Sequence, residues 1–302
     1  MAETWRARGW LVTVDPTRAA GHATELARQA AQAGFALVLA AGGDGTLGEV
    51  ANGLAYTDVV MGVLPMGTAN SFARELGLPR PGLWTAERVL AASQALTRGR
   101  VQRIDLGYTH DQAGGNGRYW LLWSGMGADG VLVSHIEPRP KWSKRLGVWG
   151  YIGQGLTVLP RMPDIAATVT IDGRTYADEY VLVLLSNCRL YAGGHILLSP
   201  QAQLDDGQWE VWFFRGRGPI DTMTHIYRCL RGQHLHSDQA MMVQGKVVTV
   251  ETAVPIPCQR DGDKAGHTPL HCEIKPGALR LLVPPTTPTD LFCQPGATFP
   301  LT

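Results

Sequence analysis

The segment Gly42-Gly43-Asp44-Gly45-Thr46 constrains this chain more than any other. It follows the apolar run Phe35–Ala41 and precedes Thr46–Leu54, where apolar residues recur at helical spacing. A strand that is apolar throughout is typical of a parallel sheet covered on both faces. Ligands of such sheets bind where strands end and helices begin. The sequence therefore predicts a ligand site at this turn.

The residue types in the turn indicate which ligand it would take. Gly42, Gly43 and Gly45 allow a phosphate to approach the backbone closely. The N–H groups of such a turn and of the next helix attract anions. Asp44 is explained if it also positions Mg²⁺, directly or through water. The turn predicts a Mg²⁺–nucleotide site, and an ordinary tight strand–helix turn is the alternative.

A second element of the same kind follows the next apolar strand, Val59–Leu64. It runs from Pro65 to Arg74 and opens a short helix. Thr68 and Asn70 can cap that helix and can also reach a phosphate or a ribose. Because two such turns end adjacent strands, we expect them to act on one ligand.

The coarse pattern predicts two domains. Up to Leu96, strands alternate with helices, starting with a short strand at Leu11–Val14, and this favours a parallel sheet with flanking helices. Beyond Ile104, strands dominate, and Asp172-Gly173 marks a hairpin. We expect an α/β domain over residues 1–103 and a mostly antiparallel β-sandwich over residues 104–302, with the tail as a candidate to return to the first domain.

Composition narrows the function classes. The formal net charge of +1 gives no support for nucleic-acid binding by bulk charge. The five cysteines have irregular spacing and the histidines show no metal-binding pattern, so a reducing cytoplasm fits best. No apolar run reaches the roughly 18 residues of a membrane span, and the N-terminus has no signal-peptide pattern.

These motifs resemble the diacylglycerol kinase catalytic-domain family. The match is closest to its YegS-like bacterial lipid kinases, with sphingosine kinases as more distant relatives. NAD kinases share the Gly42–Thr46 pattern, whereas Gly67-Thr68-Ala69-Asn70 is specific to the lipid-kinase branch. The resemblance implies an ATP- and Mg²⁺-dependent transferase of phospholipid metabolism that phosphorylates the hydroxyl of a diacylglycerol-like lipid. It also implies an active site in the cleft between the two domains.

The resemblance carries site residues over to this chain. A structural Mg²⁺ is expected at Asp206 and the carbonyls of Gln203 and Gln208, and Asp105 belongs to a metal-and-water network. The nucleotide-binding set is Thr17, Gly42, Gly43, Asp44, Gly45, Thr46, Leu47, Gly48, Thr68 and Asn70.

The turn Arg260-Asp261-Gly262-Asp263 resembles the Asp-Gly-Glu turn of the family. Its last carboxylate is the general base that takes the proton of the lipid hydroxyl, and here that residue is Asp263, one methylene shorter. Asp261 and Asp44 complete the expected catalytic set. From the residues alone, the same turn is a common hairpin connection.

Departures from the family keep two alternatives open. Ser71 and Asp263 stand where the family has Asp and Glu, and the chain starts at what resembles the second strand of its relatives, so we expect their first strand and helix to be lacking. One alternative is a kinase of a soluble acceptor, as in NAD kinase. The other is a nucleotide- or lipid-binding homologue that has lost turnover.

The expected partners are a nucleoside triphosphate and a lipid at the membrane surface, without nucleic acid; a homodimer is a further expectation. The segment Lys141–Tyr151 mixes basic and aromatic residues, which suits a membrane interface as well as it suits a surface helix with a buried aromatic face. The expected location is the cytoplasm, with a peripheral position at the inner membrane surface.

Overall fold

The computed structural model describes residues 1–79, 85–111, 115, 117–136, 157–158 and 165–299. The chain divides into two compact units, and the first segment of unit 1 ends at Leu106. Two segments of the second half of the chain join the first unit. Unit 1 comprises Met1–Leu106, Gln203–Asp206 and Pro276–Thr302, and unit 2 comprises Gly107–Ala202 and Gly207–Lys275.

The sheet of unit 1 combines strands from both ends of the chain. Strands β1 and β2 are parallel, and the last part of β15 pairs with β2 in the same direction. Strand β3 pairs with β15, and the short β16 runs antiparallel to β3. The bounds are β1 Leu37–Gly42, β2 Val60–Pro65, β3 Arg100–Asp111, β15 Leu270–Val283 and β16 Ala297–Thr298.

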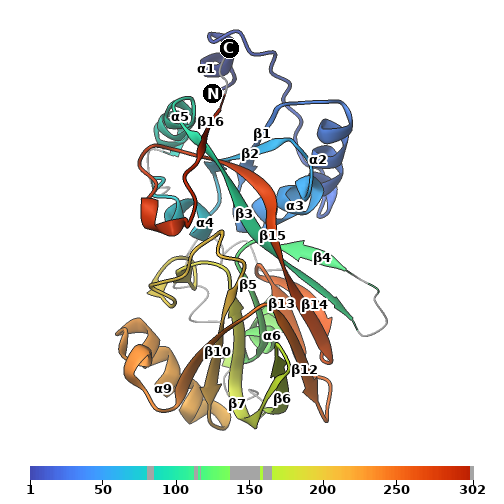
Figure 1. Ribbon diagram of the computed structural model, residues 1–302, viewed down its shortest axis with the longest axis vertical. Helices are drawn as coiled ribbons and strands as arrows, with labels where there is room; N and C mark the ends of the chain where they lie inside the picture. Colours follow the sequence, from blue (N-terminus) through green and yellow to red (C-terminus); the bar gives the residue numbers. More distant parts are fainter. Residues whose placement is uncertain (80–84, 112–114, 116, 137–156, 159–164, 300–302) are drawn as a thin grey trace. The chain divides into compact units, whose positions relative to one another are not determined.

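Helices cover both faces of β1 and β2 (Figure 1). Helices α2 and α3 lie on one face, and α4 and α5 on the other. Gly53 allows α3 to approach α2, because a Cβ at this position would lie 2.5 Å from the carbonyl oxygen of Thr24. The bounds are α2 His22–Gln32, α3 Asp44–Leu54, α4 Ser71–Glu75 and α5 Thr85–Leu96.

The expected strand at Leu11–Val14 is wrong. These residues form no regular structure, and Leu11 and Val14 are 91% and 71% exposed. The N-terminus is instead held by the short helix α1 (Ala2–Arg6), whose buried Trp5 donates from Nε1 to Ser93 Oγ over 3.0 Å. A short apolar run does not pair as a strand when its side chains find no core to enter.

Unit 2 is antiparallel, and the predicted hairpin at Asp172-Gly173 joins β6 to β7 with positive φ at both turn residues. The single strand expected at Tyr119–Trp123 is wrong, because the chain forms two strands separated by Leu121 and Leu122. The bounds are β4 Arg118–Trp120, β5 Trp123–Gly127, β6 Ile165–Ile171, β7 Arg174–Ser186, β8 Leu190–Tyr191, β9 Ile196–Leu197, β10 Trp209–Arg215, β11 Ala240–Gly245, β12 Val247–Thr252, β13 Pro257–Arg260 and β14 Asp263–His267.

The core of unit 2 lies within a β-sandwich. The first half of β7 pairs with β6, and its second half lies between β5 and β10. Large side chains from these strands fill the interior, among them Tyr180, Trp209 and Phe213. Helices α6 (Ala128–Ile136) and α9 (Gly218–Leu230) flank the strands. The predicted fold class, an α/β part followed by a β-sandwich, is confirmed.

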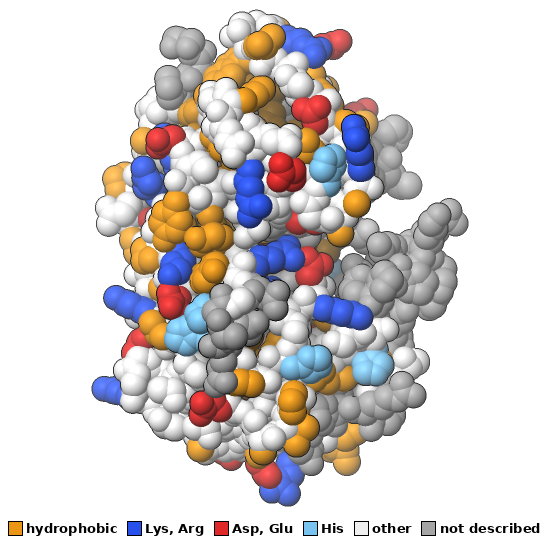
Figure 2. Space-filling view, turned by 90° about the vertical axis from the view of Figure 1, so that its right-hand side faces the viewer, with side chains coloured by type: hydrophobic (Ala, Val, Ile, Leu, Met, Phe, Trp, Pro, Cys, Tyr) orange, Lys and Arg blue, Asp and Glu red, His pale blue; other side chains and the backbone are white. Residues whose placement is uncertain are grey.

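The surface carries mixed charge. On the face shown in Figure 2, acidic and basic side chains are interspersed over the described residues, and no extended field of one sign is visible there.

None of the described helices combines the length and the apolar character that a membrane span requires.

A buried carboxylate in unit 2 orders the turn between β13 and β14. Asp129, in the first turn of α6, accepts a hydrogen bond from Gln259 Nε2 over 2.6 Å. Gln259 Oε1 in turn accepts the N–H of Gly262 over 2.9 Å. Burial raises the pKa of Asp129 to about 6, against hydrogen bonds from Tyr191 and Gln259 that lower it. The position of Asp129 in the first turn of α6 favours the anion by about 1 kcal/mol, and burial, the largest cause of the shift, decides the direction.

This pKa shift predicts a pH-dependent stability. The folded-state pKa of Asp129 lies above its unfolded value of 3.8. The contribution of Asp129 to the free energy of unfolding is therefore fully present below pH 3.8 and is lost as the pH rises through about 6. Asp129→Asn removes the titration while keeping the size. We expect the unfolding free energy of the variant, relative to wild type, to rise by roughly 2 kcal/mol between pH 4 and pH 7. Urea unfolding across this range measures the difference, and parallel profiles for the two proteins would contradict the assignment.

Candidate functional site: two glycine turns and an aspartate hairpin

The first glycine turn leaves backbone donors open. Helix α3 begins at Asp44, and Leu47 N–H donates to the carbonyl of Gly43 over 3.1 Å as its first backbone bond. The N–H groups of Asp44, Gly45 and Thr46 precede that bond, so they have no acceptor within the helix. A Cβ added to Gly45 would meet no atom within 4 Å. Open space beside unbonded amides is the environment that a phosphate requires.

The two turns pack backbone against backbone. A Cβ on Gly67 would lie 2.4 Å from the Cα of Gly43, and one on Gly43 would lie 3.2 Å from the Cα of Gly67. The N–H of Met66 also donates to the carbonyl of Gly42 over 3.0 Å. A side chain at position 67 would collide with the backbone of Gly43, which explains the glycine there, and one at position 43 would be in tight contact with Gly67.

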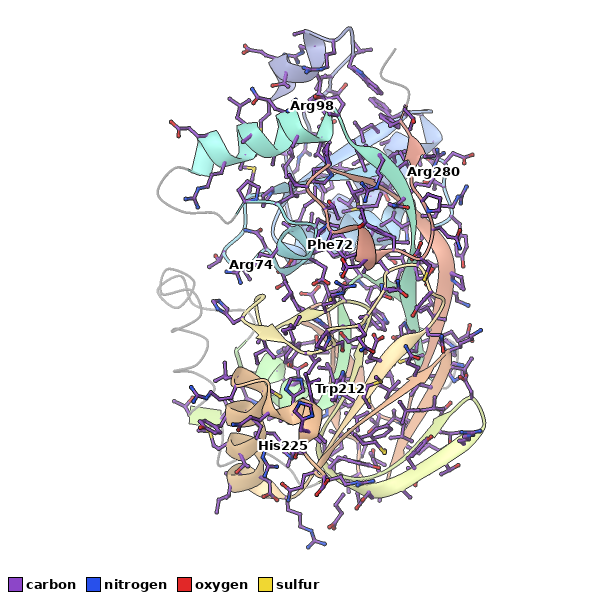
Figure 3. All side chains as sticks on the ribbon, turned by 60° about the vertical axis from the view of Figure 1, so that its left-hand side comes forward. Phe72, Arg74, Arg98, Trp212, His225 and Arg280 are labelled. Atoms are coloured by element: carbon purple, nitrogen blue, oxygen red, sulfur yellow. The ribbon has the colours of Figure 1, made fainter. Side chains whose placement is uncertain are left out.

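Asp44 connects the first turn to the helix that follows the second. Its carboxylate accepts the N–H groups of Ser71 at 2.9 Å and Phe72 at 3.1 Å, so it caps α4 from outside. The predicted metal-positioning carboxylate is therefore also a structural cap. In Figure 3, Phe72 lies inside unit 1 and Arg74 lies nearer its edge.

The second turn is closed by Asn70. This residue is buried with φ of 51°, and its amide bonds both backbone groups of Gly67, at 2.9 Å and 2.6 Å. Asn70 thus shapes the turn, whereas Thr68 is exposed to solvent. Ser71 has a buried Oγ with no hydrogen-bond partner among the described residues.

Sequence reasoning missed Glu49. Its carboxylate accepts the N–H groups of Gly21 at 2.8 Å and Ala23 at 3.1 Å, so it caps α2 as Asp44 caps α4. The predicted nucleotide residue Thr17 lies exposed in the segment before this cap. No local pattern reveals the role of Glu49, since its partners precede it by 26 and 28 positions.

Three acids of interest, Asp105, Asp205 and Asp206, belong to unit 1. Burial, and then the charges of Asp205, Asp206 and Asp105, raise the pKa of the Cys293 thiol. Asp105 accepts the N–H of Gly277 over 2.7 Å, and its own N–H donates to the carbonyl of Leu204 over 2.7 Å. These three carboxylates are not among the described groups of acidic, histidine and cysteine ligands that lie closely enough together to hold a metal ion.

Asp205 holds the C-terminal segment in place beside this group, by accepting the N–H groups of Cys293 at 2.6 Å and Gln294 at 3.0 Å. Asp105 and Asp205 both line an open pocket of about 400 Å³, together with the cationic Arg103 and Arg280. Of the remaining predicted ligands, Gln203 lies in unit 1 and Gln208 is part of unit 2.

The two aspartates of the β13–β14 hairpin differ in environment. Asp261 is 6% exposed, and its carboxylate accepts the N–H groups of Leu121, Leu122 and Trp123 at 2.7, 2.7 and 3.2 Å. Burial raises its pKa to about 6. The side chain of Asp263 is 47% exposed and lies 3.2 Å from Arg118 Nη1. Of the two, only Asp263 is accessible to another molecule.

Tertiary structure also creates a group that spacing did not predict. The ligand atoms of His110, His271 and Glu273 lie within 4.8 Å of one another. Glu273 already pairs with Lys275 and His271, and the hydrogen bond from Lys275 is the main cause that lowers its pKa. Among the described residues, the Glu273 carboxylate is therefore already hydrogen-bonded to Lys275 and His271.

Comparison with known proteins identifies the family of the chain. Residues 1–109 match the diacylglycerol kinase catalytic domain, and residues 127–283 match the YegS C-terminal NAD kinase beta sandwich-like domain. A diacylglycerol kinase of Bacillus subtilis (strain 168) is 30% identical over 86% of this chain and 82% of its own length. The corresponding protein of Staphylococcus carnosus (strain TM300) is 29% identical over 86% of this chain and 81% of its own.

A solved structure with a similar fold indicates the same family. A protein of Bacillus anthracis str. Sterne, provisionally named a diacylglycerol kinase, superimposes with a TM-score of 0.69 at 26% identity, covering 90% of this chain and 84% of its own. The two domain matches follow one another along the chain and leave few residues between them. From these matches and the paired glycine turns, we conclude that the chain belongs to the diacylglycerol kinase family of lipid kinases.

Proposed function

We propose that this protein transfers the terminal phosphoryl group of ATP to the hydroxyl of a diacylglycerol-like lipid. The observation that carries the proposal is the pair of glycine turns with open amides at Asp44, Gly45 and Thr46. The named relatives support the same activity. The defining experiment incubates the protein with labelled ATP, Mg²⁺ and a panel comprising diacylglycerol, sphingosine and NAD. Labelled lipid supports the proposal, and label in NAD alone refutes it.

The nucleotide phosphates would lie against the backbone of Gly43–Thr46, at the N-terminus of α3. Thr68 is exposed beside this turn and is the second polar group that could reach them, while Asn70 keeps the turn in shape. Bound Mg²⁺ would neutralise charge on the phosphates and could be held by Asp44 through water. The carboxylate of Asp44 already fixes the spacing of the two turns, so we assign it a positioning role as well.

The acceptor hydroxyl would lose its proton to Asp263. General-base catalysis requires a carboxylate within hydrogen-bond reach of the substrate, and Asp263 is accessible where Asp261 is not. Asp261 instead ties the hairpin to the segment between β4 and β5, so we assign it a positioning role. Arg118 lies beside Asp263 and restrains the direction of its side chain.

We also propose that the protein works at the inner membrane surface, where its lipid acceptor resides. The basic and aromatic segment Lys141–Tyr151, which the sequence favours for this contact, lies outside the described residues. A homodimer remains a prediction from the sequence.

Gly45→Ala tests the nucleotide site. The added methyl group meets no protein atom, and alanine favours a helix, so the unfolding free energy should stay the same or rise by up to about 1 kcal/mol. The methyl group fills the space assigned to phosphate, so ATP affinity measured by calorimetry should fall at least tenfold. Gly67→Ala is the contrast, because its methyl group collides with Gly43 and should lower the melting temperature. Normal ATP binding by Gly45→Ala would show that the phosphates bind elsewhere.

Asp263→Asn tests the general base. It keeps the size but removes the basicity, so lipid phosphorylation should fall by roughly 10²-fold or more while ATP binding persists. The half-exposed pair with Arg118 contributes about 1 kcal/mol at most, so the melting curve should change little. Asp263→Glu should retain activity. Lys264→Gln, which changes charge at the next position, serves as the control. Wild-type turnover by Asp263→Asn would exclude the base.

Asp206→Asn tests the structural Mg²⁺. An ion bound only to the folded protein adds to its stability, so Mg²⁺ in excess over EDTA should raise the wild-type melting temperature by a few degrees. The variant should lose this response, and Asp238→Asn, which changes an exposed acid of unit 2, should keep it. If wild type shows no response to Mg²⁺, the carboxylates of this group bind only backbone amides and solvent.

A further inference from the structure

Helix α9 carries an exposed apolar stripe. Ile220, Met223, Tyr227 and Leu230 follow one another at helical spacing of three and four residues, and they are 81%, 41%, 56% and 55% exposed. Ile226 lies next to the stripe and is also exposed. A surface helix normally turns such a stripe towards the core. Here the apolar face of the helix points away from it.

The opposite face of α9 is polar and fixed to unit 2. Thr222 and His225 are buried, and His225 Nε2 lies 2.7 Å from the carbonyl oxygen of Arg215. The His225 ring contacts the Phe214 ring edge-on, with 5.2 Å between the ring centroids. Figure 3 shows His225 and Trp212 on the side of α9 that faces the strands. Hydrogen bonds therefore hold the helix with its apolar stripe outward.

The ends of α9 are also anchored. Asp221 accepts the N–H of Arg217 over 2.7 Å, and Arg228 donates to Ser237 Oγ at 3.0 Å and Gln239 Oε1 at 2.6 Å. These bonds make rotation of the helix, which would bury the stripe, costly. The apolar side chains are thus a stable feature of the described surface.

Charge indicates what covers the stripe. Arg228 and Arg231 flank it, while Arg217 at its N-terminal end is ion-paired with Glu179. The single acid of this segment, Asp221, is bonded to backbone. A second copy would present arginines to these arginines. A bilayer with anionic headgroups offers the complementary charge, and it accepts apolar side chains and the Tyr227 ring at its interface.

We propose that α9 is a membrane-docking helix, which lies in the headgroup region with Ile220, Met223, Tyr227 and Leu230 inserted. This inference rests on the proposed lipid acceptor, since docking would bring the protein to the surface that contains it. The stripe needs no conformational change to insert, because its side chains are already exposed.

The test compares the full chain with the double variant Ile220→Gln/Tyr227→Gln in vesicle flotation. The vesicles are phosphatidylcholine alone or an equal mixture with phosphatidylglycerol. Wild type should bind the mixed vesicles more tightly, and the variant should lose at least about tenfold in affinity. Val254→Gln, at an exposed apolar position outside α9, should bind like wild type. Arg231→Gln should lose about fivefold on mixed vesicles only.

Two further readouts separate docking from catalysis. The double variant should phosphorylate a short-chain, water-dispersed diacylglycerol at the wild-type rate, and a vesicle-embedded one more slowly. Vesicle binding through α9 without any phosphorylation would uphold docking while refuting the kinase assignment. Equal vesicle binding by wild type and double variant would overturn the docking role. A wild-type dimer in light scattering that the double variant converts to monomer would also overturn it, in favour of a second copy.

Discussion

The carboxylate of Asp44 is the contact on which the candidate nucleotide site depends. Asp44 belongs to the first glycine turn, and its carboxylate accepts the N–H groups of Ser71 and Phe72 at the start of α4. This contact sets the distance between the ends of β1 and β2. The close approach of Gly43 and Gly67 is possible only while this distance is kept. Removing the cap would cost about 1 kcal/mol by itself. It would also release the turn whose amides face the proposed phosphates, so stability and binding are coupled at this residue.

Other carboxylates of the chain also accept backbone N–H groups. Glu49 caps α2, Asp205 holds Cys293 and Gln294, and Asp261 holds three amides between β4 and β5. In each case a carboxylate satisfies backbone donors that no helix or strand partner reaches. Buried or half-buried acids therefore shape the loops of both units. This explains why several residues of the candidate site are acidic without all being free to act on a substrate.

Asp261 and Asp263 show that the position of a carboxylate decides whether it holds a loop or stays accessible to solvent. Two residues apart in one hairpin, they differ in exposure because the positive φ of Asp261 turns its side chain inward to the amides of the β4–β5 segment. Asp263 begins β14 and points to Arg118 and solvent. A charge that is held by three amides keeps a loop in place, whereas an accessible one can take a proton.

The sequence by itself determined the alternation of strands and helices, the two glycine turns and the family, since these depend on periodicity and on short local motifs. It predicted the Asp172-Gly173 hairpin correctly for the same reason. Only the tertiary structure decided that Leu11–Val14 is not a strand, that Asn70 faces its own turn and that Glu49 caps α2. It also decided that α9 turns its apolar face outward. Each of these features depends on partners that are distant in the chain, or on which face of a helix or strand packs against the core. Local residue patterns carry no information about either.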